Sequence, residues 1–155
     1  MITLNSLMNL YSKCAKLPAG KRIFSKLICL KAPYFGTIKP LFEELRPGYC
    51  EIKMKNRRAV HNHIKSVHAI AMCNISELCA GTMLEATLPP SMRWIPNGMT
   101  VEYLKIARTD LKAVCEISTE DLDNPQELPM SVHVTDTSEA EVFRAVITMY
   151  ISKKK

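Results

Sequence analysis

Apolar residues recur at the spacing of an α-helix in three segments of the chain. In residues 3–17 and 23–28 they form one face of an amphipathic helix, and basic residues occupy the other. Residues 66–88 are apolar on nearly every face, which is typical of a helix that is buried on most sides. Ser66 can cap this helix, and Pro89 ends it. The pattern therefore predicts two short amphipathic helices and one long central helix.

An alternating pattern of apolar and polar residues predicts strands on both sides of the long helix. Before the helix, residues 41–45 and 49–55 are joined by a turn. After it, four strands are predicted at residues 100–107, 111–118, 130–135 and 141–151, with a polar loop at residues 121–129. Runs of strands around a single helix favour an α+β fold in which an antiparallel sheet wraps around that helix.

Length and composition narrow the class of protein. A chain of 155 residues, 47% of them hydrophobic, is typical of one globular domain and excludes wholesale disorder. No apolar stretch reaches the roughly 18 residues that a membrane span needs. The six cysteines form no C-x-x-C pair, and no signal peptide is evident. We therefore expect a reduced, cytoplasmic protein.

The net charge of +6 is concentrated at one end of the chain. Residues 1–31 contain six basic residues and no acid, and residues 32–155 hold 15 basic and 15 acidic residues. A nucleic-acid-binding domain usually carries its basic stripe on the folded body, so we expect no nucleic-acid partner. Basic amphipathic helices also suit a membrane surface, and a peripheral membrane contact through residues 1–31 stays open beside simple packing on the body.

Glu77 is an acid in the middle of the long apolar helix. A buried carboxylate is costly unless it is paired or used in function. The alternative to a functional role is a Glu that pairs with a neighbouring Arg or reaches the surface, and burial alone does not decide between the two. In a functional site, desolvation would raise the pKa of the Glu77 carboxyl toward the range useful for acid–base chemistry.

The start of this helix carries a second chemical feature. Amide N–H groups near His68 and Ala69 have no partner inside the helix, and they can hold an oxyanion. His68 lies about 180° around the helix from Glu77 and some 13 Å away. One chain does not easily bring both to the same small substrate, but a two-fold dimer can.

The spacing of Asn62, His68, Ala69 and Glu77 resembles that of the hotdog-fold acyl-CoA thioesterases of the phenylacetate-degradation type. A closer resemblance is to the DUF4442 branch of that superfamily, whose motif also includes His63 and Ser66. The resemblance covers roughly residues 35–152. It implies a hotdog domain at residues 33–155, preceded by amphipathic helices at residues 1–32.

The resemblance also implies roles for individual residues. Glu77 would be the catalytic carboxylate, which activates water or attacks the thioester carbonyl, and Asn62 would position the water or the thioester. The Ala69 N–H would donate to the oxyanion, and Thr100 would orient the water. In such relatives, the Asn and the helix-start N–H come from one subunit and the acid and hydroxyl from the other. Substrate contacts are expected from His63, Ser66, His68, Asn74 and Gly81.

Three residues depart from the motif of the thioesterases. Ala69-Ile70 replaces Gly-Gly at the helix start, and Lys65 stands where relatives often have Gly. The implied activity is hydrolysis of an acyl-CoA or related thioester by a homodimer or a dimer of dimers. No cofactor is expected, because coenzyme A is part of the substrate. The alternative is a hotdog protein that binds acyl-CoA or a fatty acyl group without turnover.

Three further interpretations rest on isolated residues. His61, His63 and His68 could hold zinc, although no nearby Cys or acid completes an obvious set, and we expect no metal. Cys73 is a weak candidate nucleophile, because nothing on a buried helix lowers the pKa of its thiol. Candidate contacts to the phosphates of coenzyme A are Lys105, Arg108 and Lys112.

Overall fold

The computed structural model describes residues 5–155. Its elements in chain order are the helices α1 (Ser6–Ala15) and α2 (Gly20–Lys31), the 3-10 helix η1 (Pro33–Ile38), the strands β1 (Leu41–Arg46) and β2 (Tyr49–Met54), the 3-10 helix η2 (Arg58–Val60), the helix α3 (Ala69–Thr87), and the strands β3 (Met92–Tyr103), β4 (Leu111–Glu116), β5 (Gln126–Thr135) and β6 (Glu141–Lys153). The predicted start of the first helix at residue 3 lies outside the described residues.

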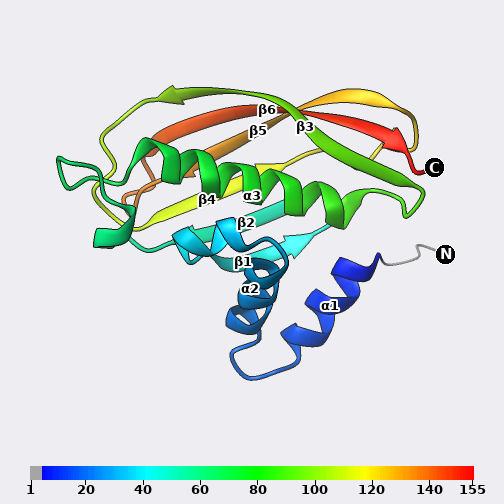
Figure 1. Cartoon of the computed structure of the whole chain (residues 1–155), viewed down its shortest axis with the longest axis horizontal. Coiled ribbons are helices and arrows are strands. Elements are labelled where there is room, and N and C mark those ends of the chain that lie inside the picture. The colour runs from blue at the N-terminus through cyan, green and yellow to red at the C-terminus, as the bar shows by residue number, and fades with distance from the viewer. Residues whose placement is uncertain (1–4) are drawn as a thin grey trace.

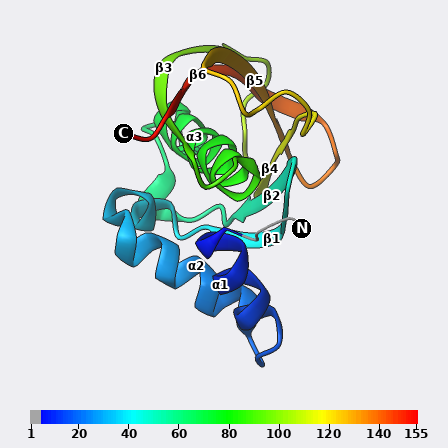
Figure 2. The same cartoon turned by 90° about the vertical axis from the view of Figure 1, so that its right-hand side faces the viewer.

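The six strands form one antiparallel sheet in the order β1-β2-β4-β5-β6-β3. Figure 1 shows α3 lying along this sheet, and Figure 2, which looks nearly down α3, shows the sheet curling around it. Ile75, Cys79 and Met83 of α3 are fully buried against the sheet. The predicted α+β architecture, a hotdog fold with N-terminal helices, is confirmed.

The start of α3 differs from the prediction. The N-cap is His68 and not Ser66, because the Nδ1 atom of His68 accepts the Ile70 N–H at 3.0 Å. The Ser66 hydroxyl instead accepts a hydrogen bond from the Asn62 side chain at 2.8 Å. Residues 66–68 therefore belong to the loop before the helix.

Two strands begin earlier than predicted. Each contains a proline, which argues against a strand in the sequence, but each proline lies where one side of its strand has no neighbouring strand to bond. The strand predicted at residues 100–107 is β3, which starts at Met92 and ends at Tyr103. Its Pro96 lies on the edge of the sheet beside a bulge. The second half of the predicted polar loop at 121–129 belongs to β5. Here Pro129 pairs with β6, and β4 pairs only with residues 132–135.

The N-terminal helices pack against the β1 edge of the sheet (Figures 1 and 2). Phe24 of α2 is fully buried between Tyr11 and Phe42, with ring centroids 5.0 and 5.1 Å away. The Ser25 hydroxyl accepts the Phe42 N–H at 2.9 Å, which ties α2 to β1. The core is therefore continuous from these helices to the sheet, and a domain boundary at residue 32 stays a prediction. Within residues 5–155, no helix is both long and apolar enough to cross a membrane.

The turn between β5 and β6 depends on one carboxylate. Asp136 accepts hydrogen bonds from the Ser138 hydroxyl and from the N–H groups of Ser138 and Ala140, and it pairs with Lys105 at 3.2 Å. These donors and the lysine charge lower the pKa of Asp136 to about 2. Because the folded state favours the charged form, this contribution to stability is present above the ordinary pKa of about 4 and is lost as the pH falls from there toward 2.

Asp136→Asn is therefore expected to lower the Tm at pH 7 and to weaken the dependence of Tm on pH between about 4 and 2. Thermal melts followed by circular dichroism measure both effects. Asp123→Asn, in the exposed loop before β5, is the matched control and should behave as wild type. Equal pH profiles for wild type and Asp136→Asn would show that the turn does not depend on the charge.

Candidate functional site

Glu77 lies at the mouth of a groove of about 380 Å³ along the middle of α3. The side chain is half-buried, and within residues 5–155 its carboxylate forms no hydrogen bond or ion pair. No arginine pairs with this acid among the described residues, but the side chain reaches the surface, as the second part of the alternative interpretation expects. An acid at a groove with both oxygens free can accept a proton from a bound molecule.

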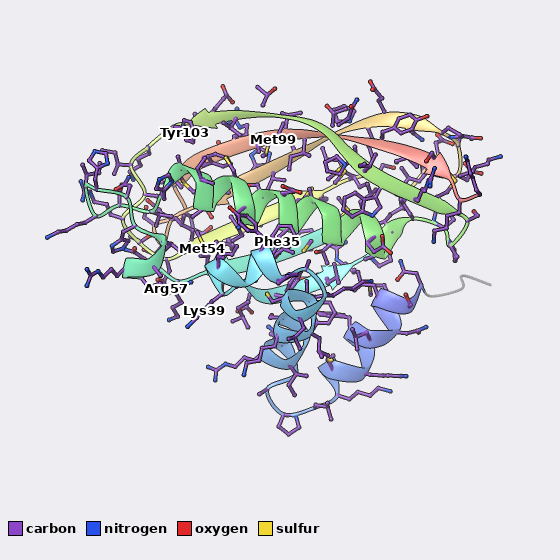
Figure 3. The ribbon with its side chains drawn as sticks, in the orientation of Figure 1. Phe35, Lys39, Met54, Arg57, Met99 and Tyr103 are labelled. Atoms are coloured by element: carbon purple, nitrogen blue, oxygen red, sulfur yellow. The ribbon has the colours of Figure 1, made fainter. Side chains whose placement is uncertain are left out.

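The groove has apolar walls from two segments that lie far apart in the sequence. Leu7 of α1, Ile28 of α2 and Phe35 of η1 line one side, and Trp94 and Pro96 of β3 line the other. Phe35 is labelled in Figure 3. The N-terminal helices therefore form part of the groove, a role that their amphipathic pattern alone did not reveal.

Gly81 lets the indole of Trp94 approach α3 closely in the wall of this groove. A Cβ atom at Gly81 would lie 2.7 Å from the Trp94 ring, which is far closer than van der Waals contact. The ring is also fixed by its Nε1–H, which donates to Glu85 at 2.7 Å. Gly81 is thus a point of close packing that sets the position of Trp94, and a substrate contact at Gly81, which lines the groove, stays a prediction.

The start of α3 lies at a separate, shallow pocket of about 350 Å³ that is lined by Asn62, Ala69, Met72 and Tyr103. The Ala69 N–H makes no hydrogen bond within residues 5–155, as expected for the first turn of a helix. This donor and the Glu77 carboxylate line different pockets of one chain.

Asn62 organises the loop before α3. Its Oδ1 accepts the N–H groups of Ile64 and Ser66, both at 3.1 Å, and its Nδ2 donates to the Ser66 hydroxyl at 2.8 Å. Lys65 in this loop adopts φ +60°, the left-handed region that favours glycine, so the Gly that the resemblance implies at this position would fit the same turn. His63 is exposed at the same loop.

Thr100 does not lie beside Glu77. It pairs with Val146, which is exposed on the outer face of the sheet, whereas its neighbours Met99 and Val101 pair with buried residues of β6. Directly opposed residues of two strands point to the same face, so Thr100 points away from α3. The reason is the bulge between Pro96 and Gly98, which shifts the alternation of side chains by one residue.

The face of β3 toward α3 is incompletely covered. Met99 and Tyr103 point to this side, yet they are 41% and 56% exposed (Figure 3). The strand is also an edge of the sheet, with one side unpaired over twelve residues. A long, exposed, apolar edge is typical of a surface that another chain covers.

The geometry gives little support to a metal site, to a cysteine nucleophile or to the expected lysine contacts with coenzyme A. In the part of the chain from residue 5 on, no three His, Cys, Asp or Glu side chains come together as a metal site. His61 contacts the Asn56 side chain at 2.5 Å instead. Burial raises the pKa of the Cys73 thiol, which disfavours a thiolate nucleophile. Lys105 and Lys112, two expected contacts to coenzyme A, are paired with Asp136 and Glu139.

Comparison with known proteins places this geometry in context. The family model of a domain of unknown function, DUF4442, matches residues 20–151. A solved protein described as genomics APC5556 is 45% identical with a TM-score of 0.85, and the match covers 97% of this chain and 100% of that chain. No functionally curated protein matches the sequence.

Two more distant structures share the fold. A Pseudomonas aeruginosa protein described as a probable thioesterase is 20% identical with a TM-score of 0.78, covering 89% of this chain and 97% of that chain. A hypothetical thioesterase protein from Streptococcus pneumoniae, solved with coenzyme A, is 16% identical with a TM-score of 0.63, covering 75% and 90%. These similarities confirm the hotdog fold.

Gly81→Ala is expected to displace Trp94 and to destabilise the protein by about 1–3 kcal/mol through overpacking, although alanine is the better helix former. Urea unfolding measures the loss, and the double variant Gly81→Ala/Trp94→Leu should recover most of it. Because Trp94 is the only tryptophan, its emission also reports the movement. A single variant more stable than wild type would contradict the close packing.

Proposed function

The chain belongs to the DUF4442 family, and we propose that it is a thioesterase that hydrolyses an acyl-CoA or a related thioester. Its fold is that of proteins described as thioesterases, one of them solved with coenzyme A. The observation that carries the proposal is the Glu77 carboxylate, which is free of partners in the described chain and faces an apolar groove. A carboxylate in that position is suited to act on the carbonyl of a bound acyl group.

The proposed reaction uses Glu77 as a general base. The carboxylate takes a proton from a water molecule, whose oxygen attacks the thioester carbonyl. The carbonyl oxygen becomes an oxyanion, which the Ala69 N–H of a partner subunit stabilises at the positive end of α3. The C–S bond then breaks, the proton passes to the thiolate, and the products are a carboxylic acid and a free thiol.

We infer that the complete site needs two copies of the chain. A two-fold pairing through the unpaired edge of β3 would run the strands antiparallel, so that Tyr103 of one copy lies near the start of the partner's strand. Tyr103 lines the helix-start pocket, and Trp94 at the start of the strand lines the groove of Glu77. This pairing would therefore join the two half-sites and cover Met99.

The groove is proposed to hold the acyl chain, because its walls are apolar and the N-terminal helices supply Leu7 and Ile28. A membrane contact through residues 1–31 stays a second proposal for these helices. It is supported by Leu17, Leu27 and Leu30, which are 52%, 37% and 78% exposed on a basic segment.

Glu77→Gln is expected to lower kcat/KM for acyl-CoA hydrolysis by about 100-fold or more, because the amide cannot take a proton from water. Thiol release from a panel of acyl-CoAs measures the loss. Glu85→Gln, on the same groove, is the matched control, since glutamine can still accept the Trp94 N–H. Its activity should stay within a few-fold of wild type.

Two results would contradict this proposal. One is a Glu77→Gln variant that retains wild-type hydrolysis. The other is a wild-type protein that binds acyl-CoAs tightly and releases no thiol from any of them. The second result would favour the alternative, a hotdog protein that binds an acyl group without turnover.

A further inference from the structure

Helix α2 is apolar on two sides, and only one of them packs against the body. Phe24 and Ile28 are buried on the inner side. A second apolar row, the outer stripe, consists of Ile23, Leu27 and Leu30, which are 37%, 37% and 78% exposed. At 100° per residue, the outer stripe covers only about 60° of the helix surface. Figures 1 and 2 show α2 at the outside of the molecule, so the outer stripe faces solvent in one chain.

Basic side chains border the outer stripe on both sides. Lys26 and Lys31 lie about 40° beyond its two margins, and Arg22 extends the border of Lys26. All three are exposed, and none forms an ion pair within residues 5–155. In the described parts of α1 and α2, only Lys21 is paired, with Glu43 of β1 on the inner side. The positive charge of the outer side is therefore not neutralised by the body of the protein.

This charge selects among the partners that could cover the outer stripe. Residues 1–31 contain no acid, so two copies of this surface would bring like charges together. An apolar stripe with basic borders is typical of helices that lie in the interface of an anionic bilayer, where the lysines stay at the headgroups. Tyr34 of η1, which is 68% exposed just beyond α2, suits the same boundary.

We propose that α2 docks on an anionic lipid bilayer, with Ile23, Leu27 and Leu30 in the acyl layer and the basic borders at the headgroup phosphates. The inference names the face and the partner for the membrane contact of residues 1–31. The docking itself does not depend on hydrolysis.

Docking through the outer stripe also sets where the groove of Glu77 lies. Lys31 borders the outer stripe and lines the groove, next to Ile28 of the inner side. The groove therefore lies beside the docked face. A long-chain acyl thioester partitions into a bilayer through its acyl chain, and this arrangement places the groove where such a chain leaves the bilayer. This second step rests on the proposed function of the groove.

Co-sedimentation of the full-length protein with vesicles tests the docking without any substrate. One kind of vesicle contains only phosphatidylcholine, and the other contains phosphatidylglycerol in addition. Wild type is expected to bind the anionic vesicles about tenfold more tightly or better, because each basic side chain near an anionic surface contributes about fivefold. Added salt should weaken this binding.

Two double variants separate the apolar contribution from the electrostatic one. Leu27→Gln/Leu30→Gln should weaken binding to the anionic vesicles about tenfold. Arg22→Gln/Lys26→Gln should weaken it by a similar factor and also reduce its dependence on salt. Glutamine preserves helix propensity at all four positions, and circular dichroism checks the fold of each variant.

Matched controls make the same chemical changes elsewhere. Ile95→Gln/Tyr150→Gln removes two side chains that are 60% and 44% exposed and oppose each other on the outer face of the sheet. Arg58→Gln/Arg93→Gln removes two charges outside the N-terminal helices. Both controls should bind the vesicles as wild type does.

Three results would overturn the proposal. The first is wild-type protein that binds neither kind of vesicle, or both alike, which would leave an acidic protein as the partner of this surface. The second is a pair of α2 variants that bind as wild type does. The third is a change of oligomeric mass in Leu27→Gln/Leu30→Gln, measured by light scattering, which would assign the outer stripe to a second copy of the chain.

Hydrolysis is measured separately. Leu27→Gln/Leu30→Gln should cleave a water-soluble, short-chain acyl-CoA as wild type does, because neither leucine lines the groove. It should cleave a long-chain acyl-CoA in anionic vesicles about tenfold more slowly. A protein that docks as expected and cleaves neither substrate keeps the bilayer surface and loses the proposed activity. A protein that cleaves both and binds no bilayer loses only this surface.

Discussion

The structure depends on how the sheet encloses α3. The helix is buried along most of its length, and in its first three turns only a narrow stripe containing Ile70, Cys73 and Glu77 stays accessible. An acid on this stripe can meet a ligand without the cost of full burial, whereas an acid on the face of α3 that packs on the sheet would lie in the core. The way the sheet wraps around α3 therefore decides which residues of the helix can contact a ligand. The N-terminal helices narrow this accessible part of the helix further.

The wrapping also leaves the two edges of the sheet covered to different extents. The edge at β1 is covered by α2, but the edge at β3 is open, and the apolar side chains of Met99 and Tyr103 are only partly covered. The helix start and the helix middle each line an incomplete pocket in one chain. Pairing of two open β3 edges would cover the exposed side chains and join the two incomplete pockets. The proposed activity and the proposed dimer are therefore one hypothesis.

The amino-acid pattern predicts elements well where one face is buried. The long helix and the order of strands follow from periodicity, because the core imposes it on residues such as Ile75 and Ile52. The pattern fails at β3, where most residues are exposed on both faces and no alternation remains. It also fails at Thr100, because the bulge between Pro96 and Gly98 reverses the direction of every later side chain. Proline and glycine within a strand often mark a bulge, and that local signal was not used. The contribution of the N-terminal helices to the groove was also missed, since only the fold brings Leu7 and Ile28 to α3.

The most direct test of the central claim mixes two inactive variants. Glu77→Gln lacks the base. Ala69→Pro lacks the helix-start N–H, and proline suits this first helical position after the extended His68. If each site combines Glu77 of one subunit with Ala69 of the other, each variant alone is inactive, and random mixed dimers regain about a quarter of wild-type activity, because each contains one intact site. A mixture that stays inactive, although native mass spectrometry detects mixed dimers, would contradict the shared site.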